Sequence, residues 1–130
     1  MVVVSDEAHK VVVVAEDYPD ISQLVADIFR SEGYGVVSVS RGGDVVPAVI
    51  RYHPAVVLLD LALPDMPGNE VLQQLAKSPD TDKVPVIIIS AYSERLQRVP
   101  QVRAVVNKPF DIDTLLRAAR EAQVPRAKAT

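Results

Sequence analysis

Cysteine is absent from the 130-residue sequence, which excludes a disulfide framework and any thiolate metal site. The net charge is −3, and lysines and arginines are scattered rather than grouped, so direct nucleic-acid binding is disfavoured. No apolar run approaches the roughly 20 residues of a membrane span, and the valines at residues 2–4 are too few for a signal peptide. We therefore expect a cytoplasmic protein that contacts neither nucleic acid nor membrane directly.

Internal repeats, low-complexity tracts and interdomain linkers are also missing. Hydrophobic residues make up 48% of the chain and charged residues 24%, which is ordinary for a globular protein. A chain of this length can bury one core but not a core plus a second module. We predict an N-terminal extension over residues 1–9, one domain over residues 10–124 and a C-terminal tail over residues 125–130.

Short valine and isoleucine runs alternate along the chain with segments of helical periodicity. Strands that crossover helices bury on both faces have this pattern. The runs predict five strands, over residues 11–15, 36–40, 55–59, 86–90 and 104–107. Apolar residues spaced three and four apart predict helices in the segments 21–29, 45–50, 71–75 and 112–119. Residues 91–100 hold at most a short helix. The fold class is therefore α/β, a doubly wound five-stranded parallel sheet with helices on both faces.

Several residues mark the ends of these helices. Gly33 stops the first helix, Asp111 caps the last one, and Pro47 is tolerable in the first turn of the second. The apolar faces of the three helices include Leu24, Ile50 and Ile112.

Polar side chains gather where four of the predicted strands end. They are Glu16, Asp17, Asp60, Ser90 and Lys108. Ligands of doubly wound sheets bind outside the carboxyl ends of the strands. We expect Asp60 to be an exposed acid at the end of its strand. Three clustered carboxylates repel one another unless a cation neutralises them, and oxygen ligands suit Mg²⁺.

This set of side chains can support phosphoryl transfer. A positioned carboxylate can attack a phosphoryl group and form an acyl phosphate, and Asp60 is the best-placed candidate. Ser90 can donate its hydroxyl to a phosphoryl oxygen. Lys108 can pair with Asp60 before transfer and with the phosphate afterwards.

Across residues 10–124 the chain resembles the receiver domain of two-component response regulators. The matching motifs are the acidic pair Glu16-Asp17, Asp60 followed by Pro64 and Gly68, Ser90-Ala91, and Lys108-Pro109-Phe110. The resemblance implies a flavodoxin-like sheet with strand order 2-1-3-4-5. It further implies that the protein is a switch rather than a turnover enzyme, catalysing only its own aspartyl phosphorylation and dephosphorylation.

The resemblance also implies roles for single residues. Asp60 would accept the phosphoryl group, Asp17 would bind Mg²⁺ directly, Glu16 would bind it through water, and the backbone carbonyl of Ala62 would be a further ligand. Ser90 would be the switch hydroxyl. The donor would be a phosphohistidine on a sensor histidine kinase or a histidine phosphotransfer protein.

The chain departs from the family pattern at two places. Val105 occupies the switch position where the family often has Tyr or Phe, and the segment between Ser90 and Lys108 is short. The surface formed by residues 91–100, the fifth strand and the last helix is where many relatives dimerise or bind a downstream target. Tyr92 and Ala62 flank the expected path to the phosphate, and we hypothesise a slowly decaying phosphoryl state.

Other functions are compatible with parts of this pattern. The main rival is a receiver-like interaction module that transfers no phosphate. A haloacid dehalogenase type of phosphohydrolase needs an acid two residues after its nucleophile, where this chain has Ala62. Nucleotide or flavin binding lacks its glycine-rich loop. His9 and His53 have no partner at metal-ligand spacing and are interpreted as surface residues.

Overall fold

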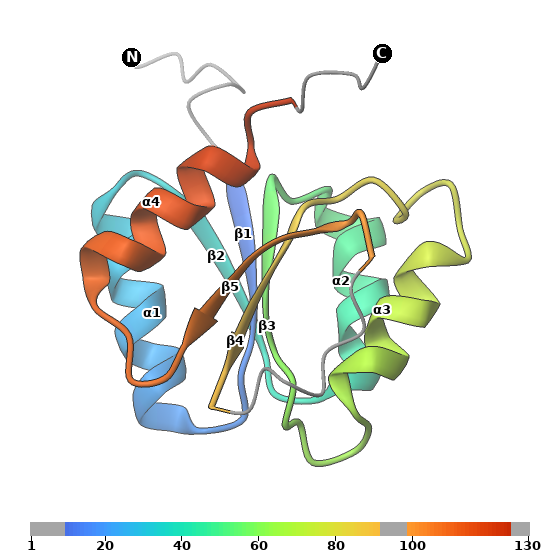
Figure 1. Ribbon diagram of the computed structural model, residues 1–130, viewed down its shortest axis with the longest axis horizontal. Helices are drawn as coiled ribbons and strands as arrows, with labels where there is room; N and C mark the ends of the chain where they lie inside the picture. The colour runs from blue at the N-terminus through green and yellow to red at the C-terminus, as the bar shows by residue number, and fades with distance from the viewer. Residues whose placement is uncertain (1–9, 92–98, 126–130) are drawn as a thin grey trace, which may run out of the picture.

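The computed structural model describes residues 10–91 and 99–125, which form a sheet covered by helices (Figure 1). The strands are β1 (Val11–Ala15), β2 (Gly35–Val39), β3 (Val56–Asp60), β4 (Val86–Ser90) and β5 (Val102–Asn107). The helices are α1 (Pro19–Ser31), α2 (Val45–Tyr52), α3 (Gly68–Ala76) and α4 (Ile112–Ala122), and a 3₁₀ turn, η2 (Gly42–Asp44), leads into α2.

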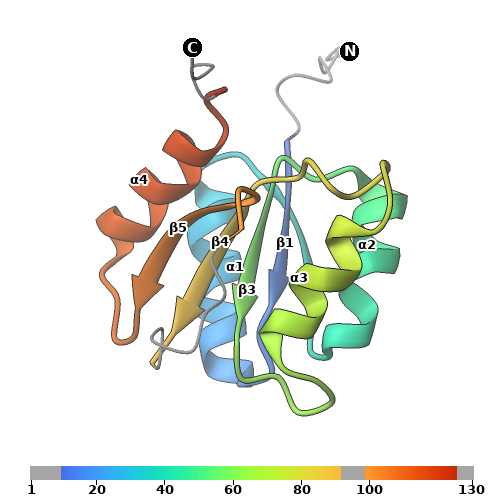
Figure 2. The same ribbon diagram turned by 45° about the vertical axis from the view of Figure 1, so that its right-hand side comes forward.

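The five strands lie in the order β2-β1-β3-β4-β5, and every neighbouring pair is parallel. Helices α1 and α4 cover one face of the sheet, and α2 and α3 cover the other (Figures 1 and 2). This arrangement confirms the predicted doubly wound α/β fold and its strand order. No helix in the described part of the chain is long and apolar enough to cross a membrane.

Each face of the sheet has its own hydrophobic core. In β1, Val12 and Val14 pack on the α1 and α4 side, whereas Val13 and Ala15 pack on the α2 and α3 side. All four are at most 1% exposed. Burial on both faces explains why the inner strands β1, β3 and β4 are continuous apolar runs rather than alternating patterns.

Hydrogen bonds at both ends of β1 define its alignment with β2. The N–H of Gly35 donates to the carbonyl of Lys10, and the N–H of Glu16 donates to the carbonyl of Val39. Val11 is therefore paired with Gly35, and Ala15 with Val39. This register places Glu16 directly beyond the carboxyl end of the strand.

The strands β1 and β4 have the predicted bounds, whereas the other three differ by one or two residues. β2 starts one residue early because Gly35 joins the ladder through its bond to Lys10. β3 is one residue later than predicted and includes Asp60, which pairs with Ile89 of β4. β5 starts at Val102 rather than Ala104, with a register shift opposite β4.

The predicted helix signals are confirmed. Gly33 follows α1 with a φ of 91°, a conformation that glycine adopts without steric cost. The carboxylate of Asp111 accepts a hydrogen bond from the N–H of Thr114 at 2.8 Å and caps α4. Pro47 lies in the first turn of α2.

Three apolar residues assigned to buried helix faces are exposed instead, because they lie at the margins of those faces. They are Leu24 at 48%, Ile50 at 45% and Ile112 at 46% exposure. Most of the segment 91–100, with its predicted short helix, lies outside the described residues.

Candidate functional site

The carboxyl ends of β1, β3, β4 and β5 meet at one edge of the sheet (Figure 2). The chain places an ionisable or hydroxyl side chain at each of these ends. Glu16 and Asp17 follow β1, Asp60 ends β3, Ser90 ends β4 and Lys108 follows β5. The structure therefore brings together all five residues that the sequence predicted for this edge.

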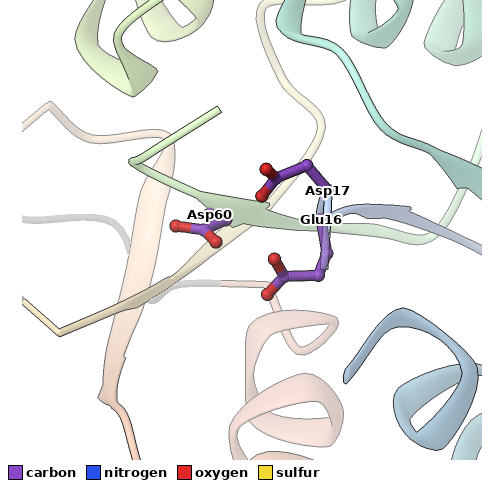
Figure 3. Close-up of side chains that lie close together, drawn as sticks. All are labelled: Glu16, Asp17 and Asp60. Carbon is purple, nitrogen blue, oxygen red and sulfur yellow. The ribbon is translucent and has the colours of Figure 1, made fainter. Parts of the chain in front are cut away.

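Three carboxylates form the centre of the site. Glu16, Asp17 and Asp60 each offer an oxygen, and these atoms lie within 4.8 Å of one another. Figure 3 shows the carboxylates pointing to the same side of the β1 and β3 ends. Glu16 and Asp60 are buried, whereas Asp17 is exposed and leaves the cluster open to solvent. This donor set suits a hard divalent cation, which prefers oxygen ligands.

The prediction that Asp60 is exposed is wrong, since only 5% of its surface reaches solvent. Its oxygen Oδ1 accepts a hydrogen bond from the N–H of Ala62 at 2.9 Å, and Oδ2 accepts one from the ammonium of Lys108 at 2.9 Å. One of these donors follows β3 itself, and the other follows β5. Both oxygens of Asp60 therefore have fixed directions.

Lys108 connects two strands through its ammonium group. Besides Asp60, it donates to Oε1 of Glu16 at 2.7 Å, and Oε2 of Glu16 accepts the N–H of Tyr18 at 3.2 Å. The pairing of Lys108 with Asp60 agrees with the expectation from the sequence, whereas its pairing with Glu16 was not expected. The sequence placed both residues at the same edge of the sheet but gave no signal for their contact.

Burial raises the pKa of the Glu16 carboxyl, and the neighbouring Asp60 raises it further against the opposing effect of the Lys108 hydrogen bond. Burial alone would lower the pKa of Lys108. The hydrogen bonds that it donates to Glu16 and Asp60 outweigh burial and raise the pKa of its ammonium above the ordinary value. The lysine therefore stays charged at neutral pH and partly balances the carboxylates.

Ser90 lies beside this group and is 3% exposed. Its carbonyl accepts the backbone N–H of Lys108 at 3.0 Å, which joins the tips of β4 and β5. Val105, at the predicted switch position, pairs with Ile88 in the middle of β5 and is half-buried against the α2 and α3 core. The structure thus places Val105 within the sheet rather than among the carboxylates.

The four remaining residues singled out in the sequence lie in different places. Ala62 is exposed and lies directly beside the Asp60 carboxylate through its N–H. His53 is exposed, as predicted, at the end of α2. Tyr92 and His9 lie outside the described residues.

Comparison with known families identifies the family to which this arrangement of strands and side chains belongs. Residues 12–120 match the family model described as the response regulator receiver domain. The chain belongs to the response regulator receiver family. Receiver domains are signalling switches of two-component systems rather than metabolic enzymes, and this membership argues against the haloacid dehalogenase and nucleotide-binding alternatives.

Relatives of this receiver domain are both short and long proteins. It is 35% identical to Protein Rrf1 of Nitratidesulfovibrio vulgaris over 93% of this chain and 87% of that protein. It is 33% identical to sporulation initiation phosphotransferase F of Bacillus subtilis over 87% of this chain and 92% of that protein. It spans only 50% of the transcriptional regulatory protein KdpE of Mycobacterium tuberculosis, at 35% identity over 85% of this chain.

Solved structures share the receiver fold at lower identity. The receiver domain of sensor histidine kinase PA1611 from Pseudomonas aeruginosa has a TM-score of 0.80 and 23% identity, covering 88% of this chain and 98% of that one. That structure has a magnesium ion coordinated in its active site cleft. A CheY-like receiver from Methylobacillus flagellatus has a TM-score of 0.77 and 22% identity, covering 87% and 98%.

Proposed function

We propose that this receiver domain is a phosphoacceptor switch that takes a phosphoryl group onto Asp60 from a sensor histidine kinase or a histidine phosphotransfer protein. The observation that carries the proposal is the position of Lys108, whose ammonium bonds to both Glu16 and Asp60 beside the exposed Asp17. A purely structural ion pair needs one acid, whereas this group has three carboxylates and one cation. The excess negative charge fits a site that binds additional positive charge.

Mg²⁺ fits the donor set as the cofactor. Asp17, Asp60 and Glu16 would supply oxygens, with Glu16 binding through water and the backbone carbonyl of Ala62 as a further ligand. When bound, the ion would neutralise charge on the transferred phosphoryl group. Because Asp17 is the exposed member, it offers the route by which a hydrated ion enters.

Transfer would proceed by in-line attack of an Asp60 carboxylate oxygen on phosphorus. The new P–O bond forms as the P–N bond of the donor phosphohistidine breaks, and the departing imidazole keeps the electron pair and takes up a proton. Lys108 can follow the added charge, because its ammonium already contacts Oδ2 of Asp60. The Ser90 hydroxyl would donate to a phosphoryl oxygen.

The signal would leave the site through the tips of β4 and β5. The backbone bond between Lys108 and Ser90 couples any shift of one residue to the other strand. The surface that includes β5 and α4 would then bind a downstream protein or a second copy of the chain. Such signalling would take place in the cytoplasm, where sensor kinases carry their phosphohistidines.

Intact mass spectrometry after incubation with Mg²⁺ and acetyl phosphate tests this function. Wild type should gain the mass of one phosphoryl group, Asp60→Ala should gain none, and the exposed-site control Asp44→Ala should behave like wild type. Chelation of Mg²⁺ should abolish the gain. An inert wild type would instead support the receiver-like interaction module.

A further inference from the structure

The loop between β3 and α3 carries Ala62 and is anchored at two points. At its base, the N–H of Gly68 donates to the carbonyl of Leu61 at 3.0 Å, and Ala62 forms an antiparallel bridge with Pro67. These contacts close the loop into a narrow turn. The N–H of Ala62 also contacts Asp60, so the base of the loop belongs to the carboxylate site.

The tip of the same loop is attached to a different part of the chain. Oδ1 of Asp65 accepts the N–H of Gly42 at 2.7 Å, and Oδ2 accepts the N–H of Gly43 at 2.9 Å. The hydrogen bonds from the amides of Gly43 and Gly42 hold the pKa of Asp65 below its usual range. The residue as a whole is exposed, but its side chain is turned toward the chain and is 16% exposed. A single carboxylate thus binds two consecutive amides of the turn that follows β2.

Close packing supports this attachment independently of the hydrogen bonds. Gly42 is buried, and a β-carbon on it would lie 2.5 Å from Cγ of Met66 and 2.9 Å from Cγ2 of Val71. Such distances leave no room for a side chain at that position. The backbone of the turn therefore packs directly against the Met66 side chain of the loop tip, and only glycine at position 42 permits this close contact.

From these contacts we infer that Asp65 is a positioning residue for the metal site, holding Ala62 in place through the turn at Gly42 and Gly43. The inference rests on the proposed function, in which the Ala62 carbonyl is a Mg²⁺ ligand. Mg²⁺ demands near-ideal octahedral geometry, so a displaced carbonyl weakens its binding. A loop fixed only at its base could tilt, whereas one fixed at base and tip cannot.

Titration of the metal-free protein with Mg²⁺, followed by the backbone amide NMR signals, tests the inference. Asp65→Ala should weaken Mg²⁺ binding about 10-fold, the usual scale for loss of a group that orients a metal ligand. Asp65→Asn keeps one acceptor oxygen and should fall between Asp65→Ala and wild type. The control Asp44→Ala also removes one negative charge, from the turn that Asp65 contacts, but the Asp44 residue is exposed, and the variant should bind Mg²⁺ as wild type does.

A second readout separates positioning from general loss of structure. The amide signals of Gly42 and Gly43 should move in Asp65→Ala before any metal is added. Phosphorylation by acetyl phosphate should need more Mg²⁺ for half of its maximal rate, yet reach the wild-type rate at saturating Mg²⁺. A merely destabilised protein would show a lowered maximal rate instead. If Asp65→Ala fails to fold, Asp65→Asn decides the question by the same measurements.

The outcomes distinguish this inference from the proposed function. If wild type binds Mg²⁺ and Asp65→Ala binds it within twofold, the positioning role is overturned and the proposed function stands. Unmoved Gly42 and Gly43 signals in Asp65→Ala would overturn it as well. If wild type binds no Mg²⁺, the proposed function itself fails and the inference falls with it.

Discussion

Removal of the Lys108 ammonium should destabilise the metal-free protein substantially. Lys108→Met would leave Glu16 and Asp60, each 5% exposed, as neighbouring carboxylates without their shared cation. Exposed ion pairs contribute about 0–1 kcal/mol, whereas breaking a buried pair from one side costs about 3–5 kcal/mol. The lysine side chain is 21% exposed, which places this case between the two limits. We expect a loss of about 2–3 kcal/mol at pH 7.

The loss should depend on pH with a definite sign. Burial already raises the pKa of Glu16, and removing Lys108 removes the largest opposing influence. The Glu16 pKa should therefore rise further in the variant. Protonation of Glu16 relieves the repulsion between the two carboxylates, so the deficit should shrink as the pH falls from 7 to 5. The raised pKa of Lys108 keeps its own contribution intact across this range, because that contribution is lost only above pH 10.5.

Urea unfolding without Mg²⁺ at pH 5 and pH 7 measures this effect. Lys83→Met is the matched control, since Lys83 is exposed at the loop before β4 and should cost little. Added Mg²⁺ should restore part of the stability of Lys108→Met, because the ion supplies the missing positive charge. A loss below 1 kcal/mol at pH 7, or an equal loss at both pH values, would refute the electrostatic account.

Two further substitutions test the local structure around the site. Gly68→Ala places a β-carbon 2.8 Å from the backbone Cα of Leu61 and should lower the free energy of unfolding in urea by about 1–3 kcal/mol. The control Gly35→Ala makes only an ordinary contact and should lower it less. Equal losses in the two variants would count against the packing argument. Asp111→Ala removes the cap of α4. Hydrogen bonds from Thr114 lower the pKa of Asp111 in the folded protein. The stabilising effect of the Asp111 carboxylate should therefore be present above pH 3.8 and vanish as the pH falls through the pKa that Asp111 has in the folded protein. The free energy of unfolding of wild type and of Asp111→Ala, measured over a series of acid pH values, tests this prediction. A difference between the two proteins that persists below the pKa of Asp111 in the folded protein would disprove the capping role.

The sequence was sufficient for the fold because the three inner strands β1, β3 and β4 are buried on both faces and therefore read as nearly unbroken apolar runs. Asp60 and Lys108 could be assigned to one edge for a related reason, since parallel strands end on the same side. The start of β5 could not be predicted, because Val102 pairs with Val86 across a register shift that local sequence does not indicate. The burial of Asp60 depends on covering groups that follow other strands.

The pairing between Lys108 and Glu16 joins residues 92 positions apart, and the attachment of Asp65 to Gly42 joins residues 23 positions apart. Neither can be read from local spacing, because each depends on how loops meet above the sheet. Glycine at position 42 gave the only sequence signal for the second contact. It marks a close backbone approach without identifying the approaching group.

Four consecutive valines in β1 carry a further consequence for how the strand finds its place. A shift of one residue normally exposes an apolar side chain, but within the four valines it would replace one valine by another. Misalignment is penalised mainly at the carboxyl and amino ends of the strand, where Ala15 would exchange places with a valine and Lys10 or Glu16 would be drawn between the neighbouring strands. Glu16, a member of the carboxylate cluster, would therefore also fix the alignment of the strand with its neighbours.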